Sequence, residues 1–256
     1  MLDDEDRDRV ALSAVVFVVL FAQILLYPGI ADLVEALGAP PSIDAGAVFI
    51  ATEFVAYVVF AGVWGAASDS SGRRVPFVVL ASAVACIAYI GVAFSPRAGL
   101  PFPAVLVVRF VQGAATVGAF SLALTTLMDL SGGHGRNMGA AGVAIGAGVG
   151  FGAPVGGFIY ETGALVPLYV AAALLGFAAL LAATVEDRAP TGERGLGRAL
   201  RRLAEAPSLV VPYVFGFVDR LTAGFFALVG TYYFRETFTL GPAERVLEKR
   251  ERGEKE

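Results

Sequence analysis

The sequence has little charge for its length. Only 16% of its 256 residues are charged, whereas soluble proteins carry about 25%. The charges are also concentrated, because 7 of the 42 lie in residues 1–9, 9 in residues 186–205 and 10 in residues 244–256. The other 214 residues carry only 16 charges, too few to cover the surface of a water-soluble globule. The composition therefore predicts a polytopic membrane protein.

Lysine, histidine and cysteine are scarcer still, and each scarcity excludes a class of protein or site. The first of only two lysines is Lys249, which excludes a seven-span retinal protein, because that class needs a Schiff-base lysine in its last span. The one histidine, His134, lies in a predicted loop, which argues against HExxH metal chemistry and Ser-His-Asp catalysis. Cys86 is the one cysteine, so no intrachain disulfide can form. We expect no enzymatic activity, cofactor or metal, and a net charge of −4 without a basic patch argues against nucleic-acid binding.

Long apolar runs are what the sequence has instead. A helix needs about 20 apolar residues to cross a hydrocarbon layer of about 30 Å. Seven runs of that size carry few or no charges: residues 10–31, 45–68, 75–96, 103–127, 137–160, 162–185 and 208–234. They do not alternate as the strands of a membrane barrel do. The sequence predicts an all-α fold with six spans in residues 10–185 and a seventh span in residues 208–235.

The arginines set the expected orientation, since cytoplasmic loops of membrane proteins are enriched in Lys and Arg. If the N-terminus is inside, the inner segments up to residue 207 contain ten arginines and the outer loops contain only Arg97. We therefore expect residues 1–9 to form a cytoplasmic leader of a multi-pass protein of the cell membrane.

Residues 186–207 form the longest connection and separate six spans from the seventh. Leu196, Leu200 and Leu203 recur there with helical spacing among arginines. This pattern favours an amphipathic helix on the inner membrane face, and a disordered charged linker is the alternative.

The last segment, residues 236–256, is a charged tail. With seven spans it would lie outside and, together with Arg235, carry six cations there, against the loop rule that holds upstream. We interpret it as a truncation or frameshift product, with the native sequence ending near Gly241.

Four charges fall at membrane depth, where ionisable residues are candidates for function. At a rise of about 1.5 Å per residue, Glu53 lies roughly 12 Å and Arg109 roughly 9 Å from the outer ends of their spans, so the two can form an ion pair. The pair either takes up a proton or substrate, or is a structural salt bridge that orders the bundle.

Asp219 and Arg220 are adjacent near the middle of the seventh span. Because neighbouring side chains on a helix point about 100° apart, at least one of the two must face a polar cavity or another helix.

The connection between the second and third spans is rich in polar residues. In it, Gly72 suits a tight turn, Asp69 can cap a helix N-terminus, and Arg73 and Arg74 can anchor to lipid headgroups. Taken alone, these features also fit an ordinary turn between two helices.

Small residues mark the fourth and fifth spans. Gln112 lies on the Arg109 face at i+3, and Gly113 permits close approach of another helix. The fifth span contains two four-residue glycine series with Pro154 and Gly157 beside them, which favour close packing and a kink. The series are Gly142, Gly146 and Gly150, and Gly148, Gly152 and Gly156.

In combination, these elements resemble the major facilitator superfamily of secondary transporters. The family's signature between spans 2 and 3 (G-x-x-x-D-R/K-x-G-R-R/K) is matched at Gly65, Asp69, Gly72, Arg73 and Arg74. Ser70 stands where a basic residue is usual. The span-4 signature (R-x-x-Q-G) fits Arg109, Gln112 and Gly113. The antiporter motif of span 5 (G-P-x-x-G-G) is resembled by residues 152–157, with Gly152, Pro154 one position late, Gly156 and Gly157.

The resemblance implies an N-terminal six-helix bundle, a linker and the first helix of a second bundle. The transport path would lie between the bundles, lined by spans 1, 4 and 7, with Gln23 and Tyr27 as polar groups of span 1. The loop with Asp69 and Arg73 would act as a cytoplasmic gate latch against the second bundle. The span-4 arginine is associated with proton coupling in antiporters of this type, and Glu53 would replace their usual span-1 acid.

These features together favour proton-coupled efflux of small organic, drug-like solutes, with the solute, protons and lipid as partners. Uptake of a sugar, organic acid or other metabolite is the alternative, because the glycine-rich span 5 could serve packing only. A third hypothesis is that the chain is a fragment that transports nothing, unless two copies associate as a homodimer to rebuild the second wall of the path.

Overall fold

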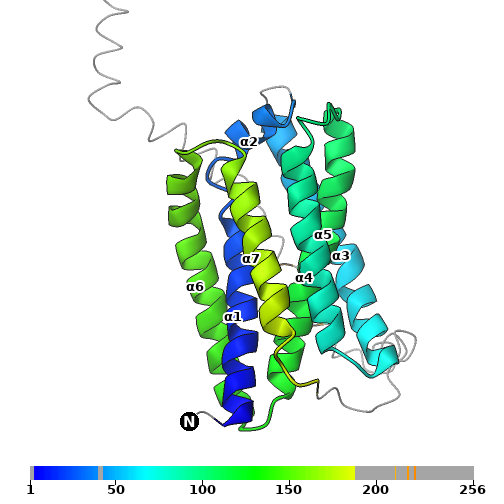
Figure 1. Cartoon of the computed structure of the whole chain (residues 1–256), viewed down its shortest axis with the longest axis vertical. Coiled ribbons are helices and arrows are strands. Elements are labelled where there is room, and N and C mark those ends of the chain that lie inside the picture. The colour runs from blue at the N-terminus through cyan, green and yellow to red at the C-terminus, as the bar shows by residue number, and fades with distance from the viewer. Residues whose placement is uncertain (1–2, 40–42, 188–210, 212–217, 219–221, 223–256) are drawn as a thin grey trace, which may run out of the picture. The chain divides into compact units, whose positions relative to one another are not determined.

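The computed structural model describes residues 3–39 and 43–187 and the single positions 211, 218 and 222. Across the described residues the chain is helical and contains no strand, which confirms the predicted all-α fold (Figure 1). The helices are α1 (Asp4–Ile24), α2 (Ile30–Ala36), α3 (Ile43–Ser71), α4 (Val75–Phe94), α5 (Phe102–Asp129), α6 (His134–Tyr160) and α7 (Val166–Ala182).

The chain divides into two units, Met1–Leu209 and Val210–Glu256. The second unit is described only at Val211, Val218 and Thr222, each of which is helical. The predicted linker is described only at Glu186 and Asp187. The rest of it, most of the predicted seventh span with Asp219 and Arg220, and the charged tail lie outside the described residues.

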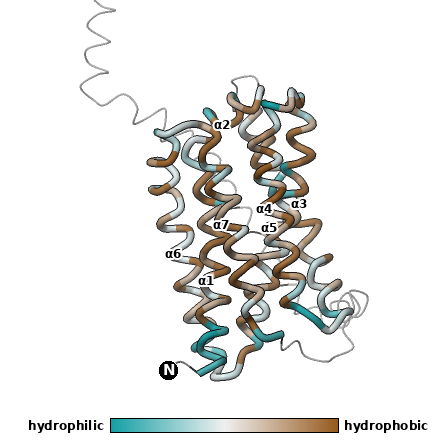
Figure 2. Tube along the Cα trace, viewed as in Figure 1, coloured by the Kyte–Doolittle hydropathy of each residue, from teal (hydrophilic) through white to brown (hydrophobic). Residues whose placement is uncertain are grey.

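Four of the described helices are long and apolar enough to cross a membrane, namely α3 from Ala45 onward, α4, α5 and α6. Helix α7 is apolar but has 17 residues, and the first six residues of α1 are all charged. Large apolar side chains stand exposed on the bundle, as at Val143 (74%) and Leu180 (73%). Figure 2 shows hydrophilic residues at the start of α1 and at the turn between α3 and α4, while apolar residues predominate along the helices.

The first span differs from the predicted run of residues 10–31 at both ends. Asp3 caps α1 by accepting the Glu5 N–H at 3.0 Å, so the helix already begins at Asp4, within the residues predicted as a leader. The helix ends at Ile24, and Pro28 and Gly29 precede the short helix α2. Proline has no N–H to donate and disfavours helical geometry in the residue before it, which separates α2 from α1 in spite of the continuous hydrophobicity.

Helix α5 contacts α1, α3 and α4, and α1 also packs against α6 and α7. Glycine allows α3 and α5 to approach closely, because a Cβ on Gly113 would lie 3.0 Å from the main-chain oxygen of Glu53. This confirms the predicted role of Gly113. Further along the same interface, Trp64 lies over Gly118 and donates its indole N–H to the main-chain oxygen of Ala114 at 2.7 Å.

Only one of the two glycine series in α6 packs against a described helix. Gly148, Gly152 and Gly156 are buried against α1, which lies beside α6 in Figure 1. A Cβ on Gly152 would meet Ile24 at 2.8 Å, and one on Gly156 would overlap the main chain of Leu25. The other series, Gly142, Gly146 and Gly150, has no atom of the described residues within reach of an added Cβ, and the same holds for Gly157. The helix continues through Pro154, which is exposed, to Tyr160.

Candidate functional site

A fully buried ion pair joins α3 to α5. Nη2 of Arg109 lies 2.7 Å from Oε2 of Glu53, and both side chains have no exposed surface. The guanidinium carbon of Arg109 also lies 4.4 Å from the ring centre of Phe49, one turn before Glu53 on α3, within the range of a cation–π interaction. The depth estimated from helical rise therefore placed the two charges correctly beside each other.

Gln112 contacts both members of this pair. Its Oε1 accepts a hydrogen bond from Nη1 of Arg109, and its Nε2 donates to Oε1 of Glu53 at 3.2 Å. The same amide nitrogen donates to Oγ1 of Thr116 at 2.8 Å, and that hydroxyl donates to the main-chain oxygen of Gln112. Thr116 was not predicted, although its position at i+4 from Gln112 places it on the same helix face.

Three tyrosines lie close enough to the ion pair to interact with it electrostatically: Tyr27, Tyr57 and Tyr89. The Tyr27 hydroxyl accepts a hydrogen bond from Nε2 of Gln23 at 2.9 Å, and both side chains are buried. Gln23 and Tyr27, predicted as polar groups of the path, therefore belong to the buried cluster around Glu53 and Arg109. Tyr57 and Tyr89 were missed because no sequence pattern distinguishes a tyrosine beside a charge from one in an apolar core.

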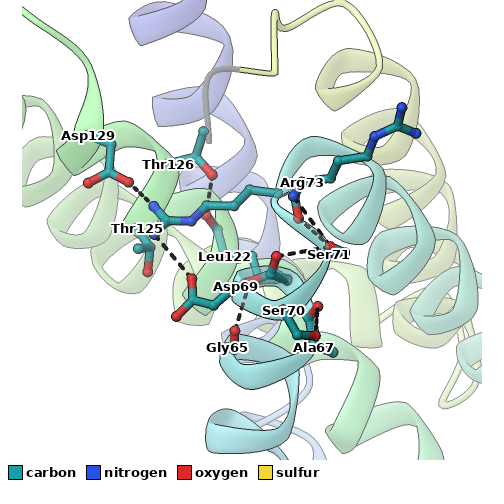
Figure 3. A network of polar contacts seen from close by, with 12 residues as sticks. Gly65, Ala67, Asp69, Ser70, Ser71, Arg73, Leu122, Thr125, Thr126 and Asp129 are labelled. Atoms are coloured by element: carbon teal, nitrogen blue, oxygen red, sulfur yellow. Dashed lines mark hydrogen bonds and ion pairs between the residues drawn. The ribbon is translucent and has the colours of Figure 1, made fainter. Parts of the chain in front are cut away.

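The loop between α3 and α4 forms a second polar centre (Figure 3). Gly72 adopts a left-handed φ of +65°, so the predicted tight turn at this glycine is confirmed. Arg73 is exposed, and its side chain extends away from the contacts made by Asp69 and Asp129. Gly65 accepts a hydrogen bond from the Ser68 hydroxyl through its main-chain oxygen at 3.0 Å.

Two expectations for this loop were wrong. Asp69 lies in the last turn of α3 rather than at a helix N-terminus, and its Oδ1 lies 3.4 Å from Nη2 of Arg74. Arg74 is only 5% exposed and also pairs with Asp129 at the end of α5, so it does not serve as a headgroup anchor. The carboxylate of Asp187 accepts a hydrogen bond from the N-terminus of α4. Neither Asp187 nor Asp129 was predicted as part of this site, because each comes from a distant part of the chain.

The charged start of α1 is joined to the connection between α5 and α6. Arg9 donates from Nε to Oδ1 of Asn137 at 2.9 Å and from Nη2 to the main-chain oxygen of Ser131 at 2.7 Å. Asp6 pairs with both Arg9 and Arg136. Desolvation raises the pKa of Asp6, but the hydrogen bonds and charges of Arg136 and Arg9 outweigh it, so the pKa lies below its ordinary value of 3.8.

An open cleft of about 470 Å³ lies between the first half of α1 and the first half of α6. Ser13 and Phe17 line one side, Val143 and Ala147 line the other, and Arg9 stands among the lining residues. Apart from Arg9 and Ser13 the lining is apolar, which suits an apolar or amphiphilic molecule better than a strongly hydrated one.

Comparison with known proteins gives two matches. The family model described as Major Facilitator Superfamily matches residues 12–248. The tetracycline resistance protein, class G, of Vibrio anguillarum is 30% identical over 188 residues, which cover 73% of this chain and 44% of that protein. The matched region thus spans less than half the length of that relative. With a family match over most of its length and four apolar helices of membrane length, the chain belongs to the Major Facilitator Superfamily and is a multi-pass membrane protein.

Proposed function

We propose that this chain acts in secondary active transport and exchanges protons for a small organic solute that leaves the cell. The observation that carries the proposal is the fully buried pair of Glu53 and Arg109. Membership of the superfamily and the similarity to a tetracycline resistance protein support it. The excess of arginine in the expected inner loops supports a cytoplasmic N-terminus in the plasma membrane.

The pair offers a physical basis for coupling. Removing the charge of one partner of a buried ion pair leaves the other uncompensated, at a cost of about 3–5 kcal/mol. A proton that binds Glu53 would therefore free Arg109 to attract another anion or to seek water. Glu53 lies on α3 and Arg109 on α5. A conformation that relieves this cost would therefore have a different contact between α3 and α5 from the one in this structure.

Gln112 would let the site change its charge without losing all its hydrogen bonds. Its amide can still donate to a protonated Glu53, and its oxygen can still accept from Arg109. Tyr57 offers a further buried hydroxyl, which has no hydrogen-bond partner among the described residues. The cluster is thus suited to hold either protonation state, as a coupling site requires.

The solute is proposed to be a drug-like organic molecule, with tetracycline as the first probe because of the name of the relative. The largely apolar cleft between α1 and α6 is compatible with such a molecule. Inward transport of a metabolite would use the same buried pair, and the direction of proton-driven flux distinguishes the two modes.

The test measures tetracycline accumulation in everted membrane vesicles whose interior is acidified. Glu53→Gln should abolish accumulation driven by the pH gradient while downhill tetracycline exchange without a gradient continues. Glu161→Gln changes an exposed carboxylate at the end of α6 and serves as the matched control, which should retain both activities. Gradient-driven accumulation that is unchanged in Glu53→Gln would remove Glu53 from the coupling mechanism.

A further inference from the structure

Helix α4 receives its N-terminal cap from a residue far along the chain. Its N-cap residue, Arg74, makes no capping hydrogen bond with its own side chain. Instead, Oδ1 of Asp187 accepts the main-chain N–H of Arg74 at 3.1 Å and that of Val75 at 3.5 Å. A carboxylate is favoured here because the first amides of a helix lack internal partners and carry the positive end of the helix dipole.

Arg74 is held both through its backbone, by Asp187, and through its side chain, by two other carboxylates. The guanidinium of Arg74 pairs with Asp69 at the end of α3 and with Asp129 at the end of α5. The backbone of Arg74 is bound by Asp187, which follows α7. The end of α3, the start of α4, the end of α5 and the chain after α7 therefore meet at the buried residue Arg74. The turn formed by Ser71, Gly72 and Arg73 immediately precedes Arg74 in the chain.

The contact is with backbone amides, since no described ion pair joins Asp187 to the guanidinium of Arg74. This distinguishes a capping role from charge neutralisation. A neutral side chain with an oxygen in the same place, such as that of Asn, should therefore still cap α4, whereas a side chain without this oxygen should leave the cap unmade.

We infer that Asp187 is a positioning residue for the loop between α3 and α4: it fixes the first turn of α4 and, through the backbone of Arg74, the place of the proposed gate loop. Displacement of the chain where it leaves α7 is transmitted to that loop through the same two hydrogen bonds. The positioning of α4 by Asp187 does not depend on the proposed gating role of residues 65–74. Only the expected effect of Asp187 on transport rests on that role.

The test uses the full chain in membrane vesicles with Cys86→Ala and a single reporter, Val75→Cys. Val75 is buried in the first turn of α4, so the reporter thiol reacts with a maleimide only when that turn opens. Loss of a helix cap changes such an equilibrium by roughly 5- to 30-fold. Asp187→Ala should raise the labelling rate by about this factor, and Asp187→Asn should leave it within about twofold.

A second reporter separates local opening from general loosening. Ala141→Cys places the thiol at a buried position of α6, a helix with no described hydrogen bond to Asp187, and its labelling should not respond to Asp187→Ala. Equal labelling of Val75→Cys in the Ala and Asn variants, or an equal rise at both reporters, would overturn the inference.

Transport separates this inference from the proposed function. Asp187→Ala should lower gradient-driven tetracycline accumulation, and Asp187→Asn should restore it. If the Val75→Cys reporter responds as expected while transport in Asp187→Ala is unchanged, Asp187 positions α4 as inferred and the gating role of the loop fails.

Discussion

Gln112 donates from Nε2 to Oε1 of Glu53 at 3.2 Å, across the interface between α5 and α3. Its amide oxygen simultaneously accepts from Arg109, so one neutral side chain forms hydrogen bonds with both members of a fully buried ion pair, while Nε of Arg109 has no hydrogen-bond partner among the described residues. Buried ion pairs are stable only when further hydrogen bonds satisfy their remaining donors and acceptors. The i+3 spacing of Arg109 and Gln112 thus allows one amide to contact both members of the pair.

The first prediction concerns the stability of this pair. Glu53→Leu and Arg109→Met should each destabilise the protein by about 3–5 kcal/mol, because each leaves one charge buried without a partner. The double variant should be more stable than either single variant, because it leaves no buried charge. Thermal unfolding of the purified full chain in detergent measures the difference. A double variant as unstable as the singles would show that the ion pair itself holds α3 against α5.

The second prediction separates Gln112 from its neighbour. Gln112→Leu should cost about 1–3 kcal/mol, because it leaves polar atoms of the ion pair without their hydrogen bonds. Thr116→Val is the matched control, since it removes one hydrogen bond to Gln112 but leaves the contacts with Glu53 and Arg109 in place. The same unfolding assay should give a clearly smaller loss for Thr116→Val. Equal losses would mean that Gln112 does not stabilise the pair.

The sequence predicts the ion pair but not the buried state of Arg74, and the reason is physical. Span boundaries and the helical rise give the depth of a charge, so Glu53 and Arg109 could be placed at one level without knowledge of the packing. Whether Arg74 faces water depends on Asp129, which is brought beside it by tertiary packing. An arginine next to an expected membrane surface was therefore taken for a headgroup anchor.

The break after α1 and the glycines of α6 show the same limit. Hydrophobicity continues from Val10 to Ala31, and it concealed the separation of α1 from α2 although Pro28 and Gly29 are visible in the sequence. Periodicity identified two glycine series in α6, but only contact with α1 reveals that the one ending at Gly156 is packed. Local sequence patterns thus predict the helices and the depth of each residue in the membrane. Which helix a given residue packs against can be read only from the assembled bundle.

The third prediction follows from this difference between the two glycine series. Gly156→Ala should destabilise the protein, because the new Cβ overlaps the main chain of Leu25, which cannot move as a flexible side chain can. Gly146→Ala is the matched control on the same helix, and an added Cβ meets no described atom there. Because alanine is the better helix former by about 1 kcal/mol, Gly146→Ala should be neutral or stabilising. Thermal unfolding of both variants checks this, and a Gly146→Ala loss as large as that of Gly156→Ala would contradict it.

The fourth prediction concerns pH and Asp6. Because Arg136 and Arg9 hold the pKa of Asp6 below 3.8, this carboxylate adds stability above that pH and loses the contribution as the pH falls through its lowered pKa. Wild type should therefore unfold at a higher temperature than Asp6→Asn at pH 6, and the gap should narrow towards pH 3. Asp4→Asn, at an exposed position of the same helical turn and in no described ion pair, is the matched control, and its loss of unfolding temperature at pH 6 should be smaller than that of Asp6→Asn. A constant gap for Asp6→Asn would indicate that its contacts do not depend on its charge.

The fifth prediction fixes the orientation of the bundle. Arg73 and Ala98 are both exposed and lie just before and just after α4, a 20-residue apolar helix long enough to cross a membrane. Single cysteines at these positions, in a Cys86→Ala background, should therefore lie on opposite membrane faces. An impermeant maleimide should label Ala98→Cys in intact cells and Arg73→Cys only in everted vesicles, because arginine-rich loops stay in the cytoplasm. The reverse pattern would place the N-terminus outside, and the proposed gate loop could not then act on the cytoplasmic side.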